Sequence, residues 1–102
     1  MSDKSFLEKD GHVVWLSPAT AKHIRNKHGI LELDAFIRDT LREPTAILRS
    51  KWEPDTRLYF KASGHLYKAV IVAWASRRIK TAHLMRAIEG GEAIWRAPSD
   101  SG

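Results

Sequence analysis

Cysteine is absent from this sequence of 102 residues. Its absence excludes disulfide bonds and thiolate metal sites, so the fold must be stabilised by packing alone. Long apolar runs are missing as well, because the longest charge-free one, residues 69–75, is far below the roughly 20 residues that a membrane helix needs. The polar N-terminal sequence MSDKSFLEKD is unlike a signal peptide. We therefore expect a soluble chain without a membrane partner.

Metal-ligand patterns are also missing. His23 and His28 are five residues apart, whereas two ligands on one helix face are three or four residues apart. No carboxylate joins these histidines at the spacing of a metal site. The sequence therefore predicts neither a metal nor any other cofactor.

Positive charge is concentrated in the second half of the chain. The formal net charge of +5 comes from 17 Lys and Arg against 12 Asp and Glu. Residues 1–44 contain seven of each sign, whereas residues 45–97 contain ten basic residues and four acidic ones. A concentrated positive field favours a polyanionic partner, most simply a nucleic acid. A basic surface that only aids solubility is the alternative interpretation.

Local signals predict two helices followed by a sheet. Ser17 is a good N-cap, Pro18 suits the first helical position and Gly29 provides a stop, so a helix is expected to end at His28. An apolar stripe predicts a second helix over residues 32–43. The expected strands cover residues 12–16, 45–52 and 57–63, a central strand from Leu66, and residues 78–84.

The fold class follows from this order of elements. We expect an α+β fold in which N-terminal helices pack on a four- to five-stranded antiparallel sheet. The length allows one domain, residues 1–102, with loose ends at residues 1–10 and 97–102.

Strand alternation assigns side chains to faces. One face of the last strand is expected to carry Ile79, Thr81 and His83, and the other Arg78, Lys80, Ala82 and Leu84. In residues 57–63, an aromatic ring lies between two cations on one face: Arg57, Tyr59 and Lys61. We expect the four tryptophans in the core and His12 at the surface.

A series of short motifs runs through residues 16–95. These are Lys27-His28, Pro44, Tyr59 to Lys61, Val70 to Trp74, Thr81-Ala82-His83, and Gly90-Gly91 leading to Trp95. In this order they resemble the barnase, EndoU, colicin and RelE nuclease superfamily, in particular its phage-associated branch, in which tyrosine is commoner at the position of His83. The stretch Asn26 to Gly29 is also similar to BrnT-type toxins.

The resemblance implies a toxin domain that cleaves RNA without a metal, by attack of the 2'-hydroxyl, and leaves a cyclic phosphate. That chemistry needs a base, an acid and cations around the phosphorane. The implied catalytic residues are His28, Arg57, Lys61, Thr81 and His83. RNA is expected to bind along the sheet through Arg49, Lys51, Tyr59, Lys68 and Lys80. The resemblance also implies an acidic inhibitor protein and action in the cytoplasm of the producing or a target cell.

Each assignment has a structural alternative. A histidine at a helix end, such as His28, caps carbonyls and complements the dipole. Thr81 fits ordinary β-propensity, and Lys61 fits a solvated strand face. Two other classes of function also fit the sequence: a non-catalytic nucleic-acid-binding or phage assembly module of the same fold, and a basic protein-interaction domain. The sequence predicts no oligomeric state and names no particular RNA.

Overall fold

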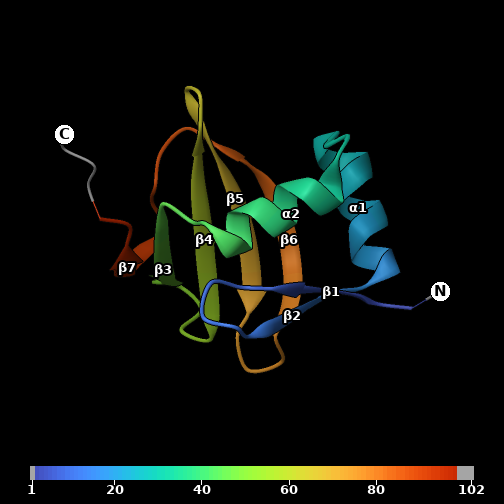
Figure 1. Ribbon diagram of the computed structural model, residues 1–102, viewed down its shortest axis with the longest axis horizontal. Helices are drawn as coiled ribbons and strands as arrows, with labels where there is room; N and C mark the ends of the chain where they lie inside the picture. The colour runs from blue at the N-terminus through green and yellow to red at the C-terminus, as the bar shows by residue number, and fades with distance from the viewer. Residues whose placement is uncertain (1, 99–102) are drawn as a thin grey trace.

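A seven-stranded mixed sheet forms the centre of the molecule, as Figure 1 shows for the computed structural model, which describes residues 2–98. The strands are β1 (Lys4–Leu7), β2 (Val13–Leu16), β3 (Ala46–Ser50), β4 (Thr56–Ser63), β5 (Leu66–Ala73), β6 (Arg78–Met85) and β7 (Gly91–Arg96). Their order across the sheet is β1-β2-β6-β5-β4-β3-β7. Strand β2 is parallel to β6, and the other neighbouring strands are antiparallel.

The predicted fold, N-terminal helices on a four- to five-stranded antiparallel sheet, is wrong. The sheet is mixed and has seven strands, and two of them, β1 and β2, precede the helices. Strand β1 comes from the segment for which the sequence predicts a loose end, and it pairs with β2 along its length. Strand β7 comes from the tail and pairs with β3. Short edge strands depend on their partners more than on their own pattern, so local alternation does not reveal them. Of the other expected loose end, residues 99–102 lie outside the described residues.

The two helices lie close to the predicted positions. Helix α1 (Pro18–His28) begins and ends at the predicted residues, and the Ser17 hydroxyl accepts a hydrogen bond from Thr20 N at 3.1 Å. Gly29 follows with φ 62°, the left-handed conformation that glycine adopts without a Cβ clash. Helix α2 (Leu33–Arg42) buries its apolar stripe. Neither helix of this described region is long and apolar enough to cross a membrane.

The sheet packs against apolar side chains on both faces. Helix α2 lies across one face of the sheet. Figure 1 shows this helix in front of β4, β5 and β6. The core on that side includes Ile47, Tyr59, Val70, Val72, Ile79 and Ala82 from the sheet. The smaller core on the opposite face contains Ala46, Leu48, Leu58, Phe60 and Ala69, with Ile88 from the segment between β6 and β7 packed against it. We call these the helix face and the open face.

The Gly90-Gly91 pair has a structural reason. Gly90 has φ 106°, and a Cβ atom at Gly91 would lie 2.0 Å from the carbonyl oxygen of Arg49. Only glycine therefore lets β7 approach β3 this closely.

A β-bulge in β6 corrects the predicted alternation. Ile79 pairs with Val72, whereas Thr81 pairs with Ile71, so Lys80 is an extra residue in β6. Ile79 therefore lies on the helix face, and Thr81 and His83 remain together on the open face. The bulge changes the side-chain phase by one residue, which period-2 alternation cannot anticipate.

Candidate functional site

Helix α1 lies beside the outer edge of β6 (Figure 1). Strand β2 occupies this edge only near the start of β6, where Trp15 pairs with Arg78. The rest of the edge is therefore free for α1 to pack against. This arrangement brings the C-terminal end of α1 to the far end of β6.

Two histidines meet where α1 ends. The rings of His28 and His83 are stacked with centroids 5.3 Å apart and an interplanar angle of 24°. His28 is exposed and His83 is half-buried. The contact joins two of the residues that the sequence predicts for catalysis, although they are far apart along the chain.

The surroundings of His28 disfavour its charged form. Partial desolvation lowers the pKa of His28 below its ordinary value of 6.5, and positive charge at His83, Lys27 and His23 lowers it further. His28 is therefore a neutral imidazole over more of the pH range than a free histidine. Lys27 is a functional candidate that the sequence reasoning missed, although the Lys-His motif contains it.

Thr81 lies on the same face as His83. The two residues are two positions apart along β6, which is about 6–7 Å along a strand. Thr81 is half-buried opposite Ile71 of β5. The three residues His28, His83 and Thr81 thus occupy one side of the β6 edge, and we call them the histidine site.

The two predicted catalytic cations lie elsewhere. Arg57 shares the helix face with Tyr59, and its guanidinium lies 3.8 Å from the ring centroid of Trp74. Lys61 Nζ donates a hydrogen bond at 3.0 Å to the carbonyl oxygen of Glu43, the C-cap of α2. Lys61 therefore caps a helix, and neither cation joins the histidine site.

Tyr59 is a core residue. Its side chain has no exposed surface, and its hydroxyl donates a hydrogen bond at 2.9 Å to Glu8 Oε2. Burial, and then the bond to Glu8, raise the pKa of Tyr59 far above 10.0. The expectation that Tyr59 contacts RNA does not fit this burial.

The other predicted RNA-binding residues are spread over the sheet. Arg49 Nη2 lies 4.0 Å from Glu92, and Lys80 pairs with Glu53. Lys68 Nζ lies 5.6 Å from the ring centroid of Phe36, on the helix face. These three cations do not form one continuous groove with the histidine site.

Lys51 lies beside an exposed aromatic ring. Its Nζ atom is 4.5 Å from the ring centroid of Trp52, which is 73% exposed. Trp15 is 40% exposed. The prediction that all four tryptophans lie in the core is therefore wrong for Trp15 and Trp52.

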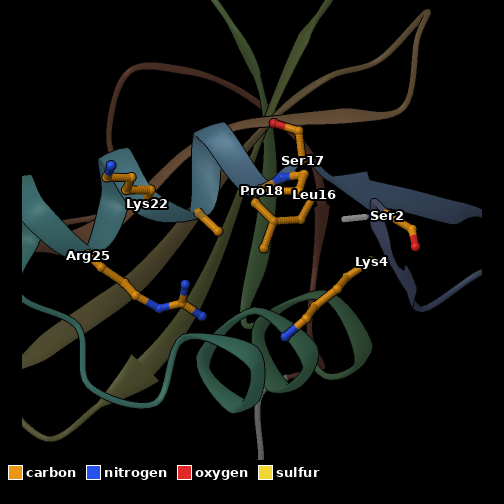
Figure 2. A pocket seen from close by; sticks show the side chains of 8 residues that line it. Ser2, Lys4, Leu16, Ser17, Pro18, Lys22 and Arg25 are labelled. Carbon is orange, nitrogen blue, oxygen red and sulfur yellow. The ribbon is translucent and has the colours of Figure 1, made fainter.

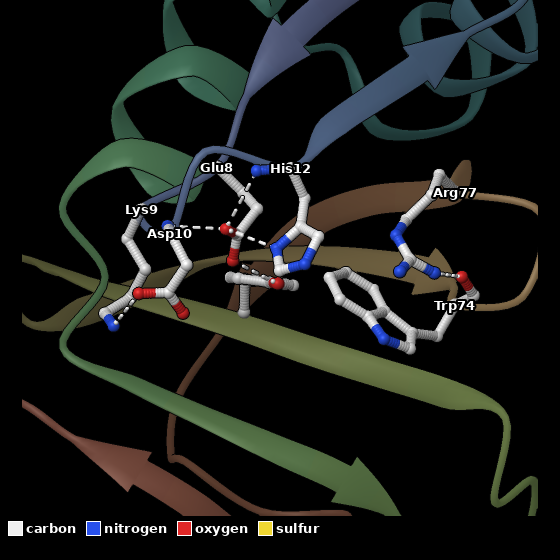
Figure 3. A network of polar contacts seen from close by, with 7 residues as sticks. Glu8, Lys9, Asp10, His12, Trp74 and Arg77 are labelled. Atoms are coloured by element: carbon white, nitrogen blue, oxygen red, sulfur yellow. Dashed lines mark hydrogen bonds and ion pairs between the residues drawn. The ribbon is translucent and has the colours of Figure 1, made fainter.

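A network around Glu8 is the main feature that the sequence did not predict (Figure 3). The Glu8 side chain is fully buried in the β1–β2 connection and accepts hydrogen bonds from His12 Nδ1 at 3.0 Å and from Tyr59. Burial raises the pKa of Glu8, but the bonds from His12, Tyr59 and Asp10 N outweigh it and leave the pKa below 4.5. His12, with 42% of its side chain exposed, lies at the surface as predicted.

A small cavity lies at the other end of α1 (Figure 2). It has a volume of about 260 Å³ and lies beside the helix N-terminus, with Lys22 and Arg25 at its rim. Lys4, which also lines it, pairs with Asp34 at 2.6 Å. The cavity extends along α1 as far as Arg25, but neither His28 nor His83 lines it. In the part of the chain that the structure describes, no three His, Asp or Glu side chains gather as metal ligands.

No protein-family model, curated protein or solved structure matches this chain. The resemblance to the nuclease superfamily therefore has no support beyond the motifs themselves.

The electrostatics of the histidine site give a prediction that does not depend on activity. The pKa of His28 should lie below 6.5 in the wild-type protein and rise in a His83→Ala variant, since the change removes both the packed ring and a positive charge. An NMR titration of the imidazole resonances measures both values. His65→Ala, at an exposed turn, is the control and should leave the pKa of His28 unchanged. An identical His28 pKa in wild type and His83→Ala would contradict the described coupling.

Proposed function

We propose that this chain is a metal-independent endoribonuclease domain in which His28 and His83 transfer protons. The contact between these two imidazoles, held by α1 and β6, is the observation that carries the proposal. Histidine suits both proton transfers because its ordinary pKa is near neutral. Lys27, beside His28, supplies positive charge where the phosphorane would form.

The reaction requires one base and one acid. The base takes the proton of the 2'-hydroxyl, the 2'-oxygen bonds to phosphorus, and the bond from phosphorus to the 5'-oxygen breaks. The acid protonates that oxygen, so the products are a 2',3'-cyclic phosphate and a 5'-hydroxyl. We assign His28 as the base, because its lowered pKa favours the neutral form. His83 is then the acid, and the Thr81 hydroxyl donates a hydrogen bond to a phosphate oxygen.

A non-catalytic nucleic-acid-binding module is the second candidate. The position of Arg57 and Lys61 favours it, because the cations best suited to phosphorane stabilisation lie away from the histidine site. Such a module would keep the net charge of +5 and its affinity for polyanions but would not cut RNA.

Cleavage in the presence of a chelator tests the mechanism. The purified protein should degrade total RNA equally well with and without EDTA, because two histidines supply the proton transfers without a metal. Fragment lengths on a denaturing gel measure the rate. Cleavage that EDTA abolishes and a divalent cation restores would overturn the mechanism. Intact RNA under both conditions would favour the binding module.

A further inference from the structure

A cluster of two arginines surrounds Trp74, at the opposite end of β6 from His83. Trp74 lies in the turn between β5 and β6, and the guanidinium carbons of Arg57 and Arg77 are each 3.8 Å from its ring centroid. A guanidinium that stacks on an indole keeps its N–H edge available for hydrogen bonds. The indole therefore holds two donor groups in place.

The backbone of Arg77 is unusual. Among residues 2–98, Arg77 is the one non-glycine residue with a positive φ, 58°. Glycine adopts this conformation more readily than arginine, because arginine has a Cβ atom. The Arg77 guanidinium also donates a hydrogen bond to the carbonyl oxygen of Trp74, which fixes its position (Figure 3). An arginine where glycine fits better makes the Arg77 side chain a candidate for a function.

The two guanidiniums lack carboxylate partners. No Asp or Glu oxygen of the described residues lies within 4.0 Å of Arg57 or Arg77. Two acids are close in sequence or space, and both are engaged elsewhere. Asp55 Oδ1 accepts a hydrogen bond from Ala75 N at 2.9 Å, and Glu8 binds His12 and Tyr59. Arg57 and Arg77 therefore form no ion pair with a side chain of the described residues.

The His12 ring lies beside the same indole. Its Nδ1 atom is held by the buried carboxylate of Glu8, and its ring lies 5.1 Å from the Trp74 ring centroid at an angle of 69°. Figure 3 shows His12 between Glu8 and Trp74. A buried carboxylate behind an imidazole fixes the orientation of the ring.

We propose that Arg57, Arg77 and His12 form a binding site for a phosphomonoester group, separate from the histidine site. A phosphomonoester has a charge of about −1.5 to −2 at pH 7 and three terminal oxygens, which match the donors of two guanidiniums beside the His12 ring. The same group occurs on a free mononucleotide and at the end of a nucleic acid strand. The proposal does not depend on RNA cleavage by the histidine site.

The test compares matched ligands that the proposed ribonuclease cannot consume. The probes are a DNA octanucleotide with a 5'-phosphate, the same octanucleotide with a 5'-hydroxyl, and deoxyadenosine 5'-monophosphate. The phosphorylated octanucleotide should bind at least about tenfold more tightly than its hydroxyl counterpart. The side-chain N–H resonances of Arg57 and Arg77 should shift on binding. Tighter binding of the octanucleotide than of the mononucleotide identifies a strand end as the source, and equal binding identifies the mononucleotide.

Two variants locate the site. Arg77→Gly should stay folded, since glycine accepts the positive φ, and should lose the preference for the 5'-phosphate. Arg49→Gln is the control, because Arg49 lies opposite Arg57 in the β3–β4 pairing and the change also removes one positive charge. This variant should keep the preference for the 5'-phosphate. The proposal is wrong if wild type shows no preference, or if Arg49→Gln loses it as fully as Arg77→Gly. Arginine resonances that do not shift on binding would also overturn it.

Discussion

Replacing Glu8 with glutamine is expected to lower the free energy of unfolding by about 3 kcal/mol, the scale for disrupting the hydrogen bonds of a buried charged group. The Glu8 side chain has no exposed surface, and its two oxygens accept hydrogen bonds from His12, Tyr59 and the Asp10 amide. Glutamine keeps the shape of the side chain, but it removes the negative charge and replaces one of the two acceptor oxygens with an NH2 group. Urea denaturation of the two proteins at neutral pH measures the difference. Asp10→Asn, an exposed acid in the same connection, is the control and should change stability by less than about 0.5 kcal/mol.

The effect of Glu8 should also depend on pH. Its pKa is lower in the folded protein than the ordinary 4.5, so the unfolded chain binds more protons between the two values. The contribution of Glu8 is therefore fully present above about pH 4.5 and is lost as the pH falls through the folded pKa. The stability difference between wild type and Glu8→Gln should shrink in acid. A difference below about 1 kcal/mol at neutral pH would contradict the account of the network.

Replacing His28 or His83 with alanine is expected to reduce RNA cleavage by a factor of roughly 10² or more, the usual scale for losing an acid or a base. Thr81→Ala should have an effect of the same order if its hydroxyl binds the phosphorane. Initial rates on a fluorescent oligoribonucleotide measure these losses. Folding should change little in His28→Ala, because His28 is exposed.

A matched control is available at another exposed histidine. His65 lies in the turn between β4 and β5, and His65→Ala should cleave RNA at a rate close to that of wild type. Circular dichroism establishes that each variant is folded. Normal cleavage by folded His28→Ala and His83→Ala would remove the histidine site from the reaction, and the binding module would then become the better proposal.

Local chemistry predicts the helices better than the sheet. The signals for α1 lie within or next to it, at Ser17, Pro18 and Gly29, so its bounds follow from the sequence. Strands β1 and β7 depend on pairing with other segments, and the bulge in β6 depends on the register against β5. Pairing of this kind has no signal within a single segment, which is why the sheet is larger than expected.

The candidate site shows the same contrast between features that local sequence predicts and features that depend on distant segments. The sequence correctly predicts that Arg57, Tyr59 and Lys61 share one face of a strand, but alternation does not say whether that face is buried. Both faces of β4 are buried, and Tyr59 can be buried on its face because Glu8 supplies a partner for its hydroxyl from 51 residues away. Acids are rarely buried without partners. Because the Tyr59 partner is 51 residues away, nothing in the sequence around Glu8 indicates that its side chain is buried.

The ends of the RNA fragments test the central proposal most directly. The purified protein should convert an oligoribonucleotide into fragments with 2',3'-cyclic phosphate and 5'-hydroxyl ends, as mass spectrometry can show, and should leave the matching DNA intact because DNA has no 2'-hydroxyl. A double variant, His28→Ala with His83→Ala, should produce neither kind of end. Fragments with 3'-hydroxyl and 5'-phosphate ends, or intact RNA after prolonged incubation with the folded wild-type protein, would contradict the proposed function.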